Sequence, residues 1–145
     1  MYVAIYGPPG AGKSTVIRAA RDAGLPAFDL EDSGGSREDR VRTVAEVARH
    51  GGSALFGAAD VPPEGFPAGT ILVLLLPSEA ALQANVELRG DRRGHKWTST
   101  ALRVRAEHEQ MASVGMFHLV LRENLSPERT LREILERTGF PGGSP

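Results

Sequence analysis

The sequence predicts an α/β fold built on a central, mainly parallel sheet, and three observations carry this prediction. Short apolar runs alternate along the chain with segments of helical periodicity, which is the pattern of successive βα units. The run at residues 71–76 is apolar at every position, as in a strand covered on both faces. A glycine-rich motif follows the first run directly, where such a fold turns from strand into helix. We therefore expect five strands, at residues 2–6, 25–30, 53–59, 70–76 and 116–121.

Helices are expected between and after these runs, because apolar residues recur there with helical spacing. Val41, Val44 and Ala48 share one face, and Gly51 follows them as a stop signal. Ser126 followed by proline is a strong start signal, with the serine as N-cap and the proline in the first turn. The expected helices cover residues 15–23, 38–50, 78–89, 98–113 and 126–138.

Residues 7–14 read Gly-Pro-Pro-Gly-Ala-Gly-Lys-Ser, a complete G-x-x-x-x-G-K-S motif for phosphate binding. Its glycines allow tight turns that point N–H groups at phosphate oxygens, Lys13 reaches the β- and γ-phosphates, and the Ser14 hydroxyl binds Mg²⁺. The helix that follows adds the positive end of its dipole. A chance glycine-rich turn is the alternative, but the strand before the motif and the helix after it favour a phosphate site. The residues expected to bind the nucleotide phosphates are Gly7, Pro8, Pro9, Gly10, Ala11, Gly12, Lys13, Ser14 and Thr15.

Length and charge bound the class of protein. The 145 residues suit a single domain, which we expect at residues 1–140, with a flexible tail at 141–145. Seventeen basic and eighteen acidic residues leave a net charge of −1, so nucleic acid and anionic membranes are not expected as partners. The absence of cysteine excludes disulfides and thiolate metal sites. The sequence opens without a signal-peptide pattern and its longest apolar stretch is six residues, which leads us to expect a cytoplasmic protein.

A basic loop at residues 89–97 is the second candidate functional segment. Five basic residues fall within eight positions there, and Gly90 and Gly94 interrupt them. Taken alone, such a loop is more often a solvated surface. Together with a phosphate loop, it predicts a lid whose arginines close on a transferring phosphoryl group and stabilise its charge. The arginines expected to do so are Arg89, Arg92 and Arg93.

Two carboxylates follow expected strands, at the edge where parallel sheets usually bind ligands. Asp29 ends the second strand, and Glu31 and Asp32 extend an acidic turn after it. Asp60 follows the third strand and is a candidate to reach Mg²⁺ through water. Each aspartate also has a structural interpretation: Asp29 as an acceptor within a turn, and Asp60 as the first residue of the proline-rich connection at 61–69.

The sequence resembles the P-loop kinases, especially the nucleoside monophosphate kinases, in the phosphate loop and in four later segments. Residues 71–136 look most like the second half of guanylate kinase, through ILVLLLPS (71–78), ELRG (87–90), LRVRAEHEQM (102–111) and FHLVLREN (117–124). The resemblance implies a strand order of 2-3-1-4-5, ATP and Mg²⁺ as cofactors, a lid at 89–97, and Arg103 as a helper of the lid. The chain departs from guanylate kinase between the second and third strands, where the acceptor region is much shorter.

We therefore expect an ATP-dependent phosphotransferase that resembles a small nucleoside monophosphate kinase, acting on a small phosphate-acceptor substrate. A nucleotide acceptor would need an arginine clamp, for which Arg37 or Arg40 is the candidate. The short insert also resembles small-metabolite kinases, in which a strand-end aspartate such as Asp29 takes the proton of a hydroxyl acceptor. Three alternatives stay open at this point: that hydroxyl kinase, a nucleotide-binding module with slow or no hydrolysis, and a nucleic-acid-associated ATPase or end kinase.

Overall fold

The computed structural model describes residues 1–32, 34–88 and 94–141, with side chains in the last segment from residue 98 on. The strands in these segments are β1 (Tyr2–Tyr6), β2 (Ala27–Asp29), β3 (Ala54–Gly57), β4 (Ile71–Leu75) and β5 (Leu119–Leu121). The helices are α1 (Lys13–Asp22), α2 (Arg37–Arg49), the 3₁₀ helix η1 (Pro63–Gly65), α3 (Glu79–Leu88), α4 (Gly94–Ser113) and α5 (Pro127–Thr138). Within the described part of the chain, every helix is too short or too polar to cross a membrane.

These strands form one parallel sheet in the order β2-β3-β1-β4-β5. Strand β1 lies at its centre, where Val3 pairs with Leu55 of β3 on one side and with Ile71 of β4 on the other. The predicted α/β class and the strand order 2-3-1-4-5 are both confirmed. Because the strands are parallel, their carboxyl ends meet at one edge, and the loops that carry the candidate site emerge together there.

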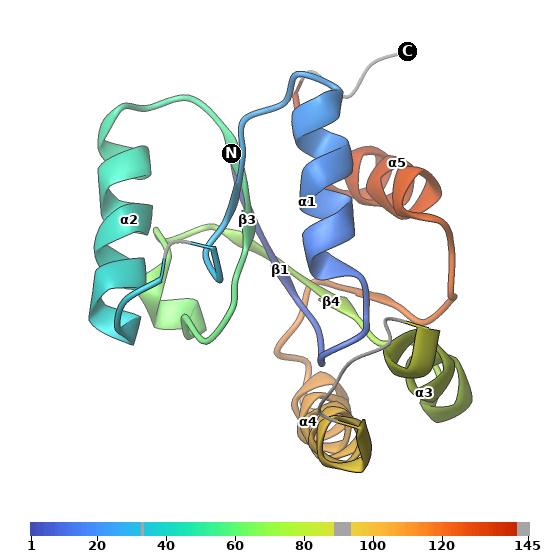
Figure 1. Ribbon diagram of the computed structural model, residues 1–145. Helices are drawn as coiled ribbons and strands as arrows, with labels where there is room; N and C mark the ends of the chain where they lie inside the picture. Colours follow the sequence, from blue (N-terminus) through green and yellow to red (C-terminus); the bar gives the residue numbers. More distant parts are fainter. Residues whose placement is uncertain (33, 89–93, 142–145) are drawn as a thin grey trace.

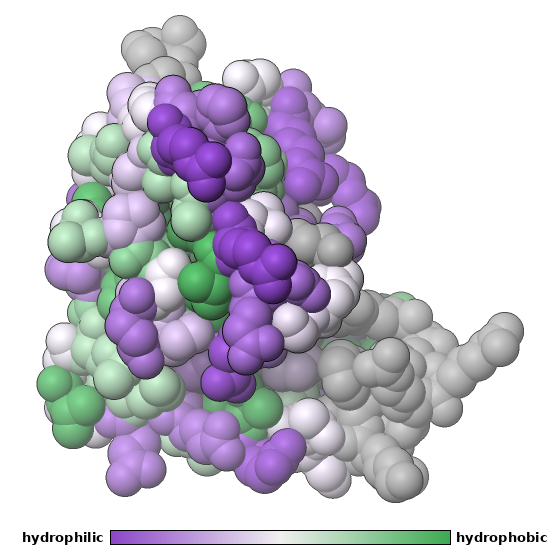
Figure 2. Space-filling model, turned by 90° about the vertical axis from the view of Figure 1, so that its left-hand side faces the viewer, coloured by the Kyte–Doolittle hydropathy of each residue, from purple (hydrophilic) through white to green (hydrophobic). Residues whose placement is uncertain are grey.

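Different helices cover the two faces of the sheet (Figure 1). Val3 and Ile5 of β1 belong to a core that includes side chains of α1 and α5. The alternate residues, Ala4 and Tyr6, belong to a second core on the side of α2. This alternation is the two-residue period of a strand, and it buries the sheet on both faces as the apolar run at 71–76 predicted. Figure 2 views the molecule from the α2 side, where many hydrophilic side chains lie on the outer surface.

Helices α3 and α4 pack against each other at the end of the sheet near the glycine-rich loop (Figure 1). Leu82 and Val86 of α3 meet Ala101 of α4 in a third, small core. Ala11 of the loop packs against that core. Two helices from the second half of the chain therefore brace a loop that lies near its beginning.

The observed elements differ from the expected ones mainly at their ends. β2 starts two residues later than expected, after Pro26, which has no N–H to donate to a strand ladder. β5 starts three residues later, because the Nδ1 atom of the His118 side chain accepts the hydrogen bond of the Leu72 N–H at 2.9 Å, in place of a backbone carbonyl. Helix α4 begins four residues earlier, at Gly94. The proline-rich connection contains the short helix η1.

Candidate phosphate-binding site

The glycine-rich motif forms the turn between β1 and α1, and its backbone angles or its close neighbours favour glycine at each of three positions. Gly10 and Gly12 have φ angles of +87° and +94°, in the left-handed region that favours glycine. A Cβ atom on Gly7 would lie 3.0 Å from the carbonyl oxygen of Leu75 in β4, and one on Gly10 would lie 2.7 Å from Cγ2 of Val86 in α3. The loop shape thus depends on its own turns and on close approach to two neighbouring elements.

Helix α1 begins inside the motif, so its first turn directs N–H groups toward the space in front of the loop. Its first hydrogen bonds start with the Val16 N–H, which donates to the Gly12 carbonyl at 3.0 Å. The Thr15 hydroxyl donates to the same carbonyl at 2.8 Å and fixes the start of the helix. The Ser14 side chain is exposed on the cavity, where a hydroxyl can meet a ligand or ion. The result is an anion-binding concavity of backbone donors.

Lys13 adds the charge that this concavity needs. Its Nζ atom donates to the Gly7 carbonyl at 2.6 Å and lies 3.5 Å from Oε1 of Glu31. The lysine side chain is 15% exposed, whereas that of Glu31 is 53% exposed, so solvent screens the ion pair. A phosphate that enters the cavity would compete with these groups for the lysine ammonium.

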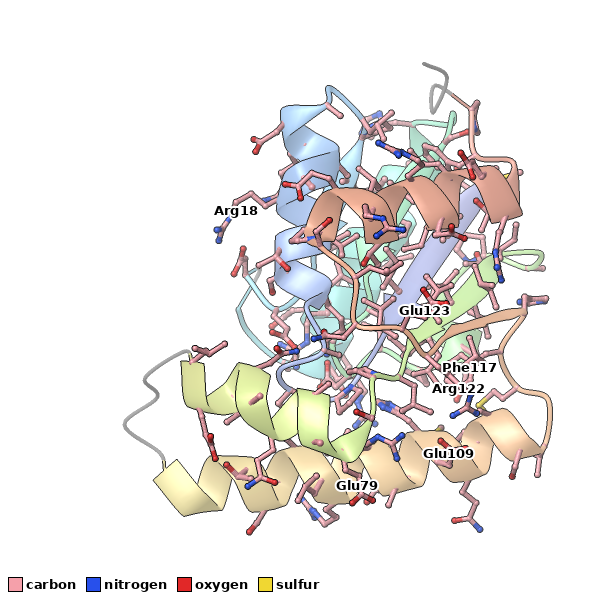
Figure 3. The ribbon with its side chains drawn as sticks, turned by 90° about the vertical axis from the view of Figure 1, so that its right-hand side faces the viewer. Arg18, Glu79, Glu109, Phe117, Arg122 and Glu123 are labelled. Atoms are coloured by element: carbon pink, nitrogen blue, oxygen red, sulfur yellow. The ribbon has the colours of Figure 1, made fainter. Side chains whose placement is uncertain are left out.

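The cavity in front of the loop has a volume of about 590 Å³, within the usual range for small-molecule sites. Four further segments complete its wall. Arg18 contributes from α1 and points away from the core in Figure 3, and Glu31 contributes from the loop after β2. The remaining wall comes from α3 and from the loop between β5 and α5, through Asn85, Leu88, Asn124, Leu125, Ser126 and Pro127.

Most of that wall was not predicted from the sequence. The segment FHLVLREN resembles a strand with a nucleotide-facing loop, and this signal could have led to Asn124, which was not among the predicted site residues. Asn85 had no such signal, because a polar residue on a helix is usually a solvated one. Its Nδ2 atom donates to the Gly10 carbonyl at 3.1 Å and to Oδ1 of Asn124 at 3.3 Å.

Asp29 and Glu31 occupy different positions at the end of β2. Asp29 is only 7% exposed, and its Oδ1 atom accepts the hydrogen bond of the Glu31 N–H at 3.1 Å. Its backbone carbonyl accepts from the Asp32 N–H at 3.1 Å. Glu31, two residues further on, lines the cavity, and Asp29 is not among the lining residues of the described chain. Asp29 is thus a turn acceptor here, and the carboxylate that faces the cavity is Glu31.

Asp60 is held by arginines of α2. Its two carboxylate oxygens accept from Nε and Nη2 of Arg40 at 2.6 and 2.7 Å, and Nε of Arg37 lies 3.6 Å away. The hydrogen bonds from Arg40 hold the pKa of Asp60 below its usual value. Nη1 of Arg40 donates to the carbonyls of Gly34 and Gly35. The pairing supports the structural interpretation of Asp60, and it engages Arg40, one of the two arginines considered for an acceptor clamp.

The three lid arginines Arg89, Arg92 and Arg93 lie outside the described residues. The ends of that segment are described: α3 ends at Leu88, which lines the cavity, and α4 begins at Gly94. The catalytic role of the three arginines stays a prediction.

Helix α4 is fastened to the carboxyl edge of the sheet by two arginines. Nε of Arg105 donates to the Pro77 carbonyl, just after β4, at 2.7 Å. Arg122, just after β5, forms a two-pronged ion pair with Glu109 of α4 at 2.9 and 3.0 Å (Figure 3). Arg103, the expected helper of the lid, is exposed on the same helix.

The same helix brings His108 within the electrostatic field of Lys13. Its ring packs edge-to-face on Phe117, with centroids 6.4 Å apart, and its buried Nδ1 atom has no hydrogen-bond partner among the described residues. Burial, assisted by the Lys13 charge, lowers the pKa of His108 to about 4. The imidazole is therefore neutral at pH 7 and adds no charge to the phosphate site.

Binding of a metal ion in this cavity would depend on the phosphates of a bound nucleotide. Among the residues that the structure describes, no group of three or more His, Cys, Asp or Glu side chains gathers to hold one. Mg²⁺ keeps several waters and is commonly bound through substrate phosphates with one or two protein oxygens. The exposed Ser14 hydroxyl beside the anion site fits that arrangement.

No protein-family model matches this sequence, and the sequence matches no curated protein. Solved structures do match. Shikimate kinase from Acinetobacter baumannii, solved with shikimate, has a TM-score of 0.66 at 17% identity, covering 94% of this chain and 92% of that one. A gluconokinase from Sinorhizobium meliloti has a TM-score of 0.62 at 18% identity, covering 98% and 90%. Deoxyadenosine kinase from M. mycoides has a TM-score of 0.61 at 15% identity, covering 96% and 99%.

These identities are low, so the matches concern the fold, and the finer resemblance to guanylate kinase stays a prediction. The glycine-rich loop and the strand order point to the same fold as these matches, which cover almost the whole chain. This chain therefore has the P-loop kinase fold, which it shares with shikimate kinases, gluconokinase and deoxyadenosine kinase.

Proposed function

We propose that this protein transfers the γ-phosphoryl group of Mg²⁺-bound ATP to a hydroxyl group of a small acceptor. The observation that carries the proposal is the position of Lys13 in the wall of a 590 Å³ cavity, between a loop carbonyl and the carboxylate of Glu31. A cation for the donor phosphates and a carboxylate for an acceptor hydroxyl thus lie side by side. The names of the matching kinases support a hydroxyl acceptor, because shikimate, gluconate and deoxyadenosine all carry hydroxyl groups.

The proposed reaction assigns one task to each part of the site. The loop N–H groups and Lys13 hold the β- and γ-phosphates, and Ser14 offers its hydroxyl to the metal ion. Bound Mg²⁺ would neutralise the charge that develops on the phosphate oxygens. The oxygen of the acceptor hydroxyl attacks the γ-phosphorus while Glu31 takes the hydroxyl proton. The bond between the γ-phosphorus and the β–γ bridging oxygen breaks, and ADP is released. The arginines of residues 89–93 would close over the transferring group.

Glu31 takes the place of Asp29 as the proposed base. Asp29 is buried and accepts a backbone hydrogen bond, so it shapes the turn that presents Glu31. A base must come within hydrogen-bond reach of the acceptor proton, and the cavity wall is where an acceptor can be reached.

A nucleoside monophosphate acceptor is less well supported. It would need arginine donors for its phosphate, and one of the two candidates, Arg40, already makes four hydrogen bonds to Asp60, Gly34 and Gly35. Binding of an acceptor phosphate by Arg40 would require these hydrogen bonds to break first.

The direct test is a screen for ADP formation with ATP, Mg²⁺ and three groups of acceptors: polyols and hydroxy acids, nucleosides, and nucleoside monophosphates. We expect turnover with members of the first or second group, and turnover about 10²–10³-fold lower in the Lys13→Ala variant. Turnover with nucleoside monophosphates alone would overturn the hydroxyl acceptor. If ADP binds but no acceptor in any group is phosphorylated, the protein is a nucleotide-binding module, the second candidate, which the short segment between β2 and β3 favours.

A further inference from the structure

Two asparagines connect the halves of the proposed nucleotide site. Asn85 lies on α3 and Asn124 on the loop after β5, 39 positions apart in the sequence, and both line the cavity. Within the described part of the chain, the Asn85 amide nitrogen donates two hydrogen bonds, one to the Gly10 carbonyl at 3.1 Å and one to Oδ1 of Asn124 at 3.3 Å. One side chain thus bridges the tip of the phosphate loop and the loop on the opposite wall.

The donor and acceptor atoms of this bridge follow from the hydrogen-bonding groups that it joins. The Gly10 carbonyl can only accept a hydrogen bond, so the Asn85 amide must turn its nitrogen toward it. The same nitrogen then requires an oxygen from Asn124. This leaves the amide nitrogen of Asn124, with its two hydrogens, as the donor available to a ligand in the cavity.

The loop that receives the bridge lies close to helix α3. A Cβ atom added to Gly10 would lie 2.7 Å from Cγ2 of Val86 and 3.3 Å from Cδ1 of Leu82, and Ala11 packs against the small core that contains both side chains. The hydrogen bond from Asn85 therefore acts on a loop tip that is already packed, and a shift of Asn85 would be transmitted to the phosphate-binding N–H groups.

We propose that Asn85 and Asn124 form a relay that links recognition of the nucleotide base to the geometry of the phosphate loop. In this relay Asn124 donates to an acceptor atom of the base, and Asn85, a positioning residue, holds Gly10 in its phosphate-binding conformation. The site should accordingly select a complete nucleotide over a base-free polyphosphate. This inference rests on the proposed nucleotide site and adds how that site reads its ligand.

The test compares calorimetric affinities for Mg²⁺-ADP and for inorganic tripolyphosphate in four variants. Asn85→Ala should raise the Kd for ADP about tenfold, the effect of one or two lost hydrogen bonds. Asn124→Ala should raise the Kd for ADP about fivefold but leave that for tripolyphosphate within about twofold. The double variant should raise the Kd for ADP about tenfold, far less than the product of the two single effects, because either change alone breaks the relay.

Gln83→Ala is the matched control, since Gln83 is an exposed amide on the same helix, two positions from Asn85. It should change neither Kd. Melting temperatures of all variants show whether a loss of affinity reflects a loss of folded protein. The relay is overturned if the loss of ADP affinity in the double variant equals the product of the two single losses. It is also overturned if Asn85→Ala changes the Kd for ADP no more than Gln83→Ala does. Neither result contradicts the nucleotide site itself. If the parent protein binds neither ADP nor tripolyphosphate, the proposed function fails and the relay fails with it.

Discussion

Lys13 and Arg40 are both cations near the carboxyl edge of the sheet, and the side chain of each is 15% exposed. Lys13 is held by the Gly7 carbonyl and by a screened ion pair with Glu31. Arg40 is held by four hydrogen bonds, two of them to the carboxylate of Asp60. Equal burial therefore accompanies unequal positions, because Lys13 lies in the wall of the cavity and Arg40 is not among the described residues that line it. The position of a cation relative to the cavity, more than its exposure, indicates whether it can serve a ligand.

The largest effect is expected when this comparison is tested on the lysine. Lys13→Ala should lower phosphoryl transfer by about 10²–10³, the usual loss for a preorganised charge contact, and should weaken ADP binding. Arg40→Ala should leave the Kd for ADP unchanged and lower the melting temperature instead. Calorimetry and thermal unfolding of the two variants measure this contrast. Equal losses of ADP affinity in both would show that Arg40 also serves the donor phosphates.

Glu31→Gln tests the carboxylate partner of Lys13. Transfer should fall about 10²-fold because a glutamine cannot accept the acceptor proton. Nucleotide affinity should be kept or improved, since no carboxylate competes for Lys13. Single-turnover transfer and calorimetry on the same preparation separate the two effects. If Asp29→Asn abolishes transfer in a folded protein and Glu31→Gln does not, Asp29 is the base.

Gly10→Ala tests whether the loop depends on its neighbour in α3. The left-handed φ and the 2.7 Å approach to Val86 should together cost about 2–4 kcal/mol of unfolding free energy. Gly24→Ala is the matched control: its φ is +80° but no atom lies within 4 Å of the added Cβ, so the cost should be about 1 kcal/mol. Urea unfolding measures both. The cost of Gly10→Ala should shrink in a Val86→Ala background, and an unchanged cost would mean that the contact with α3 is unimportant.

The smallest effect is expected at the partner of Arg40. The depressed pKa of Asp60 means that its pairing stabilises the fold above the ordinary carboxyl pKa, and that this stabilisation is lost as pH falls through the lowered value. Asp60→Asn should therefore lower the melting temperature slightly at pH 7 and flatten its decline in acid. Because the Asp60 side chain is 42% exposed, added salt should reduce the difference between variant and parent. A variant with the parent's acid profile would show that the pair contributes nothing to stability.

The sequence by itself predicted the glycine-rich loop because its motif lies in one short segment. Eight consecutive residues specify two left-handed turns, a helix start, a lysine and a hydroxyl. Apolar runs likewise predicted the strands, since a fully buried strand must be apolar on both faces. Their ends were predicted less well where a side chain such as that of His118 takes the place of a backbone acceptor.

Only the tertiary structure decided which polar side chains face the cavity. Glu31 meets Lys13 across 18 positions, and the engagement of Arg40 depends on a carboxylate twenty positions away. Asn85 reaches Gly10 across 75 positions. Such contacts leave no periodic trace in the sequence, because the distance between two segments along the chain says nothing about their distance in the fold. Their partners become known only when packed helices and parallel strands bring those segments to one edge.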